Sequence, residues 1–102
     1  MFLIEVLLPL VDNEGDRFPK EALDRVRDEL AERFGGVTAF LRTPAVGLWA
    51  DESGTLRRDD VVIVEVMTKE LDSGWWKGYR HELEQRFKQE KLILRAQETE
   101  LL

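Results

Sequence analysis

The sequence predicts an α+β domain whose elements follow the order strand, helix, strand, strand, helix, strand. Three observations support this class: a length of 102 residues, apolar residues at strand-like and helix-like spacing, and an internal repeat. A chain of this length forms one domain and buries roughly two thirds of its unfolded surface. We therefore expect a single domain over residues 1–102, with a flexible tail at residues 97–102.

The internal repeat is the motif Arg-x-Glu-Leu-x-x-Arg-Phe, which occurs at residues 27–34 and again at residues 80–87. A Leu-Arg pair follows each copy at the same distance, at residues 41–42 and 94–95. Such repetition predicts two copies of one helix-then-strand unit. Because Glu, Leu and Arg are common in helices, chance similarity is the alternative.

The first part of the chain predicts a strand followed by a helix. The strand is expected at residues 2–8, because this run is almost wholly apolar and stops at Pro9, which cannot extend a central ladder. Pro19 suits the first turn of the helix, and the pair Gly35-Gly36 suits its C-terminal cap. Between these points the apolar residues recur at helical spacing: Leu23, Val26, Leu30 and Phe34.

The middle of the chain predicts two strands joined by a long hairpin arm. A short strand at residues 37–42 is expected to end at Thr43-Pro44, since proline interrupts a ladder. The hairpin arm covers residues 45–58, with its tip at residues 51–54. The next strand, at residues 61–67, has the strongest β-propensity in the chain.

A second helix and a last strand complete the pattern. Asp72 or Ser73 can cap the helix, and the strand is expected at residues 91–97. The apolar positions of the helix are Trp76, Tyr79, Leu83 and Phe87. Right-handed crossovers within two such halves give an antiparallel sheet in the order 4-1-3-2, with both helices on one face. This arrangement is a ferredoxin-like sandwich.

The helices can cover only one face of the predicted sheet, because strand side chains alternate between two faces. The even-numbered apolar residues of the first and third strands are expected to face the helices. An apolar set remains on the open face: Leu3, Phe40, Ile63, Met67 and Ile93. Such a patch is larger than a soluble monomer normally exposes. We therefore predict a homodimer that packs through these residues, with a small-molecule ligand bound beside the interface.

Charged residues also lie on the open face. In the predicted order Arg95 lies beside Glu5, and Arg42 lies beside Glu65. Paired charges on sheets are usually structural, which favours two cross-strand ion pairs. The alternative is a cofactor-free enzyme for a small anionic metabolite. In that case a glutamate would act as the acid/base catalyst and an arginine would bind the anion.

Tryptophan marks two further candidate sites. Trp49 in the hairpin arm and Trp75 at the start of the second helix could bind a ligand or anchor an interface, where tryptophan is enriched. Core packing is the alternative for each. A third hypothesis is therefore a protein-interaction module that uses the Trp49 hairpin and the exposed edge of the second strand.

Composition disfavours several classes of function. A net charge of −6 argues against binding to nucleic acid or to an anionic membrane surface. No segment has the ~18 consecutive apolar residues that a membrane helix requires. The chain has no cysteine, which excludes disulfides and thiolate metal sites and agrees with a cytoplasmic location.

No cofactor or metal site is expected. Gly35-Gly36 ends a helix, so it cannot hold a phosphate group at a helix N-terminus. The spacing of the acidic hairpin residues matches no calcium-binding loop. These residues are Asp51, Glu52, Asp59 and Asp60. His81, the only histidine, is expected to face solvent because it lies two positions from the apolar stripe of its helix.

Part of the chain resembles a small family of uncharacterised bacterial domains. The similarity rests on the hairpin run at residues 47–51, which contains Gly-Leu-Trp, and on the helix end Arg-Phe-Lys-Gln at residues 86–89. At Leu83 the family tends to have an aromatic residue, so the similarity is incomplete. The resemblance implies a ferredoxin-like domain and transfers no activity. More broadly, the topology is similar to that of the dimeric α+β barrel proteins, in which two sheets pack open face to open face.

Overall fold

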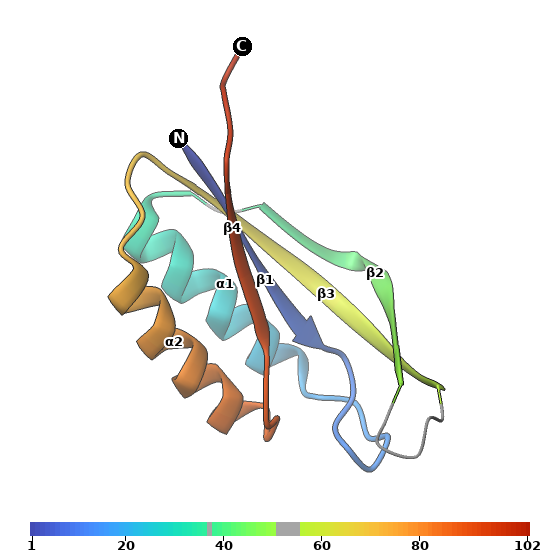
Figure 1. The fold of residues 1–102 in the computed structure, drawn as a ribbon. Coiled ribbons are helices and arrows are strands. Elements are labelled where there is room, and N and C mark those ends of the chain that lie inside the picture. The colour runs from blue at the N-terminus through green and yellow to red at the C-terminus, as the bar shows by residue number, and fades with distance from the viewer. Residues whose placement is uncertain (37, 51–55) are drawn as a thin grey trace.

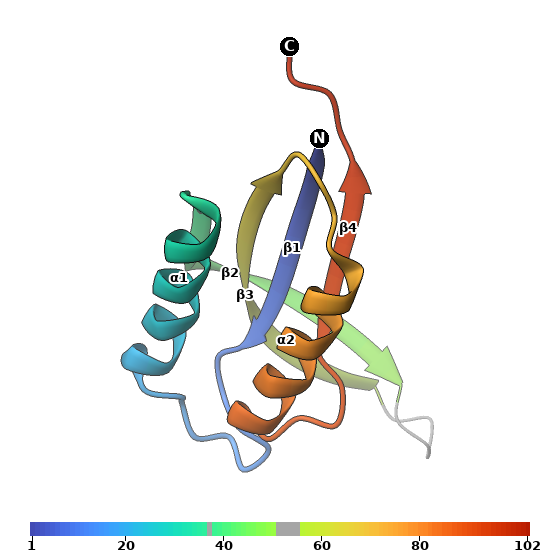
Figure 2. The same cartoon turned by 90° about the vertical axis from the view of Figure 1, so that its left-hand side faces the viewer.

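A computed structural model describes residues 1–36, 38–50 and 56–102, with side chains described for residues 1–36 and 61–102. Its elements are β1 (Phe2–Pro9), α1 (Lys20–Phe34), β2 (Thr38–Ala50), β3 (Leu56–Thr68), α2 (Ser73–Arg86) and β4 (Ile93–Glu98). They form one antiparallel sheet in the order β2-β3-β1-β4. Both helices lie on the same face of the sheet (Figures 1 and 2). The predicted α+β class is therefore confirmed.

The core lies between the helices and the central strands β1 and β3. Ladder pairing sets Ile4 opposite Val66 and Val6 opposite Val64, so these even-numbered side chains share one face. The residues of both strands that are buried against the helices are Ile4, Val6, Leu8, Val62, Val64 and Val66. The predicted alternation is confirmed for both strands. It leaves the odd-numbered residues on the face that the helices do not cover.

Helix α1 begins and ends where local chemistry predicts. Pro19 precedes its first residue, and Gly35 follows its last with φ at 80°. Only glycine adopts this left-handed conformation without a Cβ penalty, and the Gly35 N–H donates to the carbonyl of Ala31 at 2.8 Å. Of the predicted apolar stripe, Leu23, Val26 and Leu30 are buried, and Phe34 is partly buried against the core.

Helix α2 is capped at its N-terminus by Asp72, whose carboxylate accepts a hydrogen bond from the Trp75 backbone N–H at 3.1 Å. This bond satisfies one of the free N–H groups of the first turn. The predicted apolar stripe is confirmed, because its four members are buried: Trp76, Tyr79, Leu83 and Phe87. No described helix is long and apolar enough to cross a membrane.

The prediction that Thr43-Pro44 ends the second strand is wrong. Strand β2 continues to Ala50, with a shift of register between Phe40 and Ala45. β2 is an edge strand, where an irregularity of the ladder can accommodate a proline. The predicted hairpin tip lies outside the described residues.

The predicted tail also begins too early. Gln97 and Glu98 belong to β4 and pair with Leu3 and Phe2 of β1. The Thr99 N–H then donates to the Met1 carbonyl at 2.8 Å. The ladder therefore extends through the first residues of the expected tail, because β1 supplies partners for them.

Candidate functional site

The open face is the face of the sheet opposite the helices (Figure 2). Ladder partners form rows of side chains across it. Within the described side chains these rows are Gln97–Leu3–Met67, then Arg95–Glu5–Glu65, then Ile93–Leu7–Ile63. A charged row thus lies between two rows that are mostly apolar. Within the described side chains the apolar residues are incompletely covered, with Met67 43% and Ile93 52% exposed.

Glu5 and Glu65 are direct ladder partners on the two central strands. Side chains in such positions have Cβ atoms about 5 Å apart, and like charges there are destabilising. Sheet stability alone therefore disfavours this pair. A pair of carboxylates at the centre of an uncovered face is suited to bind a positively charged group.

Arg95 supplies one positive charge, as predicted. Its Nε donates to Oε1 of Glu5 at 3.0 Å. Arg95 remains 58% exposed, whereas Glu5 is only 17% exposed. The arginine can therefore contact an anionic group of a ligand while it holds the Glu5 carboxylate in place.

The expected pairing of Arg42 with Glu65 is wrong. Thr38 is the ladder partner of Glu65, and Arg42 lies farther along β2, within the stretch where the register shifts. The internal repeat predicted a helix-then-strand unit, but it does not fix the register of an irregular edge strand. The side chains of Arg42, Phe40 and Trp49 lie outside the described residues.

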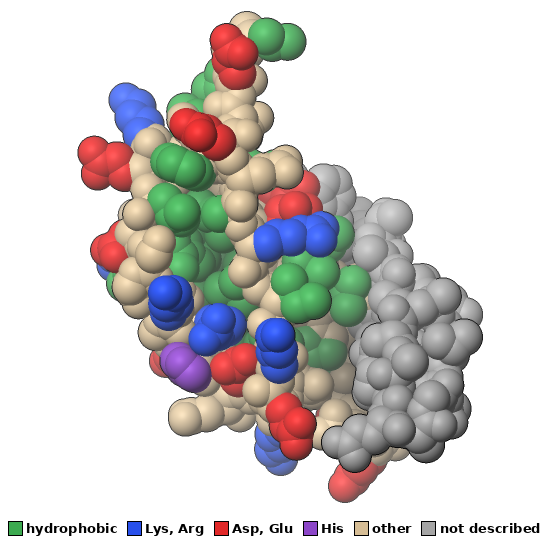
Figure 3. Space-filling model, viewed as in Figure 1, with side chains coloured by type: hydrophobic (Ala, Val, Ile, Leu, Met, Phe, Trp, Pro, Cys, Tyr) green, Lys and Arg blue, Asp and Glu red, His purple; other side chains and the backbone are tan. Residues whose placement is uncertain are grey.

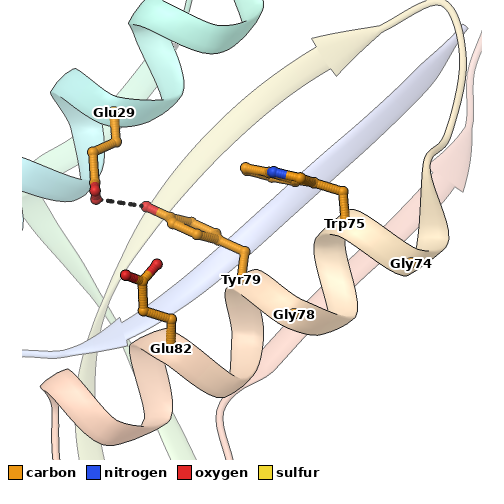
Figure 4. A pocket seen from close by; sticks show the side chains of 6 residues that line it. All are labelled: Glu29, Gly74, Trp75, Gly78, Tyr79 and Glu82. Atoms are coloured by element: carbon orange, nitrogen blue, oxygen red, sulfur yellow. Dashed lines mark hydrogen bonds between the residues drawn. The ribbon is translucent and has the colours of Figure 1, made fainter.

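A hollow lies between the two helices (Figure 4). It has a volume of about 440 Å³ and is lined by Glu29, Gly74, Trp75, Gly78, Tyr79 and Glu82. Trp75, a predicted ligand-binding residue, forms part of this wall. The predicted open-face residues are on the opposite side of the sheet, so the structure does not bring Trp75 together with them.

The two carboxylates that line this hollow, Glu29 and Glu82, are already paired with Arg86. Arg86 donates from Nη1 and Nη2 to the two oxygens of Glu29, at 2.6 and 2.7 Å. The Tyr79 hydroxyl donates to the same carboxylate at 3.1 Å. The hydrogen bonds from Arg86 lower the pKa of Glu29. Burial, followed by the nearby negative charge of Glu29, raises the pKa of Tyr79.

The aromatic rings that line the hollow pack against each other and against a neighbouring arginine. The ring of Trp75 stacks on Tyr79 at 4.9 Å, and the Arg33 guanidinium lies 4.1 Å from the Trp75 ring. Ion pairs and ring contacts together join α1 to α2. We therefore interpret the residues of the hollow as structural contacts between the two helices. The open face remains as the candidate site.

His81 faces solvent, as predicted. Its side chain is 70% exposed, and Nδ1 lies 3.4 Å from Oε1 of Glu84. The sequence did not single out the Glu29–Arg86 pair. The repeat carried a signal for it, because Glu29 and Glu82 are counterparts and both approach Arg86.

No family model matches the sequence, and no curated protein matches it. Solved structures do match. A phage SAM lyase in complex with S-methyl-5'-thioadenosine has a TM-score of 0.67 and 21% identity, over 95% of this chain and 80% of that chain. A phage SAM lyase in the apo state has a TM-score of 0.62 and 18% identity, over 94% and 78%. The fold is similar to that of a phage SAM lyase. At these identities the similarity to the lyase establishes the fold alone.

Proposed function

We propose that the protein binds an S-adenosyl-type nucleoside on the open face, with Glu5 and Glu65 beside its positive charge. The single observation that carries this proposal is the pair of carboxylates at the centre of the uncovered face. S-adenosylmethionine carries a positive sulfonium and a positive amino group, either of which fits between two carboxylates. The similarity in fold to a lyase that holds S-methyl-5'-thioadenosine supports this choice of ligand.

The neighbouring groups suit the other parts of this ligand. Its carboxylate can bind to the exposed guanidinium of Arg95. Its adenosine and methyl groups can contact the apolar rows that flank the charged row. The ligand would then remove from water part of the surface that the helices leave uncovered.

The same groups could carry out a lyase reaction. One glutamate would remove a proton from the carbon next to the one bonded to sulfur. A carbon–carbon double bond would form as the carbon–sulfur bond breaks, and the sulfur would keep the electron pair. The products would be S-methyl-5'-thioadenosine and an unsaturated amino acid, with the proton on the glutamate. No step requires an oxidant or a metal.

A second copy of the chain would complete the cover of the open face. In this part of the proposal the domain is a ferredoxin-like sandwich, and two copies pack sheet against sheet through the rows around Met67 and Ile93. The exposed fractions of these two side chains support it. A cytoplasmic location stays a prediction from composition.

Isothermal titration calorimetry with S-adenosylmethionine and with S-methyl-5'-thioadenosine tests the proposal. We expect the wild type to bind both, and Glu5→Gln and Glu65→Gln each to weaken binding of the cationic nucleoside at least tenfold. Binding of S-methyl-5'-thioadenosine, which is a neutral thioether, should be weakened less. Glu32→Gln, an exposed carboxylate on α1, is the matched control.

Two outcomes would contradict the proposal. One is the absence of binding by the wild type at millimolar nucleoside. The other is unchanged affinity for S-adenosylmethionine in both open-face variants. Chromatography of the same mixtures would show whether S-methyl-5'-thioadenosine is released, which separates an enzyme from a binding domain.

A further inference from the structure

The protein has a basic face although its net charge is −6. Lys and Arg side chains gather around the histidine over α2 and β4 (Figure 3). The elements α2 and β4 and the segment between them contain the basic residues Lys77, Arg80, His81, Lys91 and Arg95. A concentration of positive charge on an acidic protein favours contact with a negatively charged surface.

The α2 part of the basic face points toward β4. Glu84 Oε2 accepts a hydrogen bond from the Leu92 backbone N–H, immediately before β4, at 2.9 Å. Arg80 lies one helical turn before Glu84, with its Nε 3.9 Å from Glu84 Oε1. Lys77 lies nearly one further turn along the same stripe. The two cations therefore lie on the side of α2 next to β4.

Strand β4 lies at the edge of the sheet and pairs with β1 along one side only, within the described part of the chain. Its residues 93–98 contain no proline, and most of their side chains are exposed. An edge strand of this kind has unpaired N–H and C=O groups along its other side, which can pair with another strand.

Antiparallel pairing of β4 with β4 of a second copy can avoid like charges directly opposite each other. Pairing centred on Ala96 would place Arg95 of each copy opposite Gln97 of the other, and Leu94 opposite Glu98. No like charges would meet. Glu98 lies on the helix side of the sheet, because it alternates in step with Leu94, which packs against the core.

We propose that β4 pairs with β4 of a second copy in this register, and that Glu98 of each copy contacts Arg80 and Lys77 of the other. The levels agree. Arg80 lies about 6 Å along the helix from Glu84, and Leu94 lies about 6.6 Å along the strand from Leu92. Since Glu84 is bonded to Leu92, Arg80 is level with Leu94 and with the Glu98 that would lie opposite it. A twofold axis repeats the contact, which gives a self-complementary interface.

This interface lies along the edge of the sheet. Its specific contacts, from Glu98 to Arg80 and Lys77, are on the helix side, although the ladder residues Arg95 and Gln97 have their side chains on the open face. It would join two sheets edge to edge, with both pairs of helices on one side and both open faces on the other. The nucleoside site and the packing of open faces can therefore fail without affecting β4 pairing, and the reverse also holds.

A charge-swap experiment tests the proposal in solution. The acidic variant carries Lys77→Glu and Arg80→Glu, and the basic variant carries Glu98→Lys. By sedimentation, we expect each variant alone to have half the mass of the wild-type assembly, with association at least tenfold weaker. An equimolar mixture should restore that mass as a one-to-one complex. Lys69→Glu is the matched control, since Lys69 is exposed and lies outside the interface.

Amide hydrogen exchange provides a second readout that needs no variant. The β4 amides of the wild type should become more protected as protein concentration rises, whereas amides in the exposed loop at residues 12–17 should not. The proposal is overturned if β4 protection does not depend on concentration. It is equally overturned if the folded acidic and basic variants keep the wild-type mass, or if their mixture forms no complex.

Discussion

At the scale of single residues, Arg86 shows how an ion pair between helices makes stability depend on pH. Both oxygens of Glu29 accept hydrogen bonds from Arg86, and the pKa of Glu29 is lowered in the folded protein. In the unfolded chain the carboxyl group titrates near its ordinary value of 4.5. The contribution of Glu29 to stability is therefore complete above that pH, and it is lost as the pH falls through the lower folded pKa.

Glu29→Gln should make the free energy of unfolding depend less on pH in acid. We expect the variant to lose on the order of 1 kcal/mol of unfolding free energy at pH 7. The loss stays this small because the side chain of Glu29 is 36% exposed and solvent screens its charge. Below pH 4 the variant and the wild type should approach each other in stability. Urea unfolding at both pH values measures the difference. Equal losses at the two pH values, or a similar pattern in Glu32→Gln, would contradict the assignment.

Tyr79 offers a direct optical test of the same network, because it is the only tyrosine. Burial and the charge of Glu29 raise its pKa above the ordinary value of 10. In the unfolded chain the Tyr79 hydroxyl returns to its ordinary pKa, so the free energy of unfolding should fall as the pH rises above 10. We expect phenolate absorbance to appear only with alkaline unfolding, as followed by circular dichroism, and at lower pH in Glu29→Gln. Phenolate formation near pH 10 in the folded protein would show that the hydroxyl is accessible.

At the scale of elements, the C-terminus of α1 depends on one glycine of an adjacent pair. Gly35 has φ at 80°, whereas Gly36 does not adopt a positive φ. Neither position has an atom near enough to clash with an added Cβ. Gly35→Ala should therefore cost about 1 kcal/mol through backbone strain alone, and Gly36→Ala, the matched control, should be close to neutral. Equal effects in thermal unfolding would contradict this explanation.

The elements also show what the sequence can and cannot predict. The ends of α1, the cap of α2 and the alternation of β1 and β3 follow from chemistry within a few residues, and each was predicted. The continuation of β2 past Pro44 and the partner of Glu65 depend on how an edge strand meets a distant neighbour. No spacing along the chain encodes that register. Of the candidate site, the sequence predicted the Glu5–Arg95 pair but not the direct opposition of Glu5 and Glu65.

At the scale of the whole molecule, the open face is incompletely covered, and we predict that a second copy of the chain packs against it. Paired substitution of Met67 and Ile93 by lysine adds charge to the two most exposed apolar side chains of that face, among those described. If a second copy packs there, the variant should keep its secondary structure and associate at least tenfold more weakly. Sedimentation velocity across a range of concentrations measures this.

The matched control is Leu71→Lys, an exposed apolar residue at 37% in the loop before α2, which should leave association unchanged. Because the proposed β4 pairing is centred on Ala96 and its charged contacts are those of Glu98 with Arg80 and Lys77, a variant that carries both lysines should still assemble through that edge. Its mass should then fall to half the wild-type value rather than to the monomer. An unchanged mass would mean that no second copy covers the open face. The exposed apolar rows would then be available to the nucleoside alone, and S-adenosylmethionine should still bind to the isolated face.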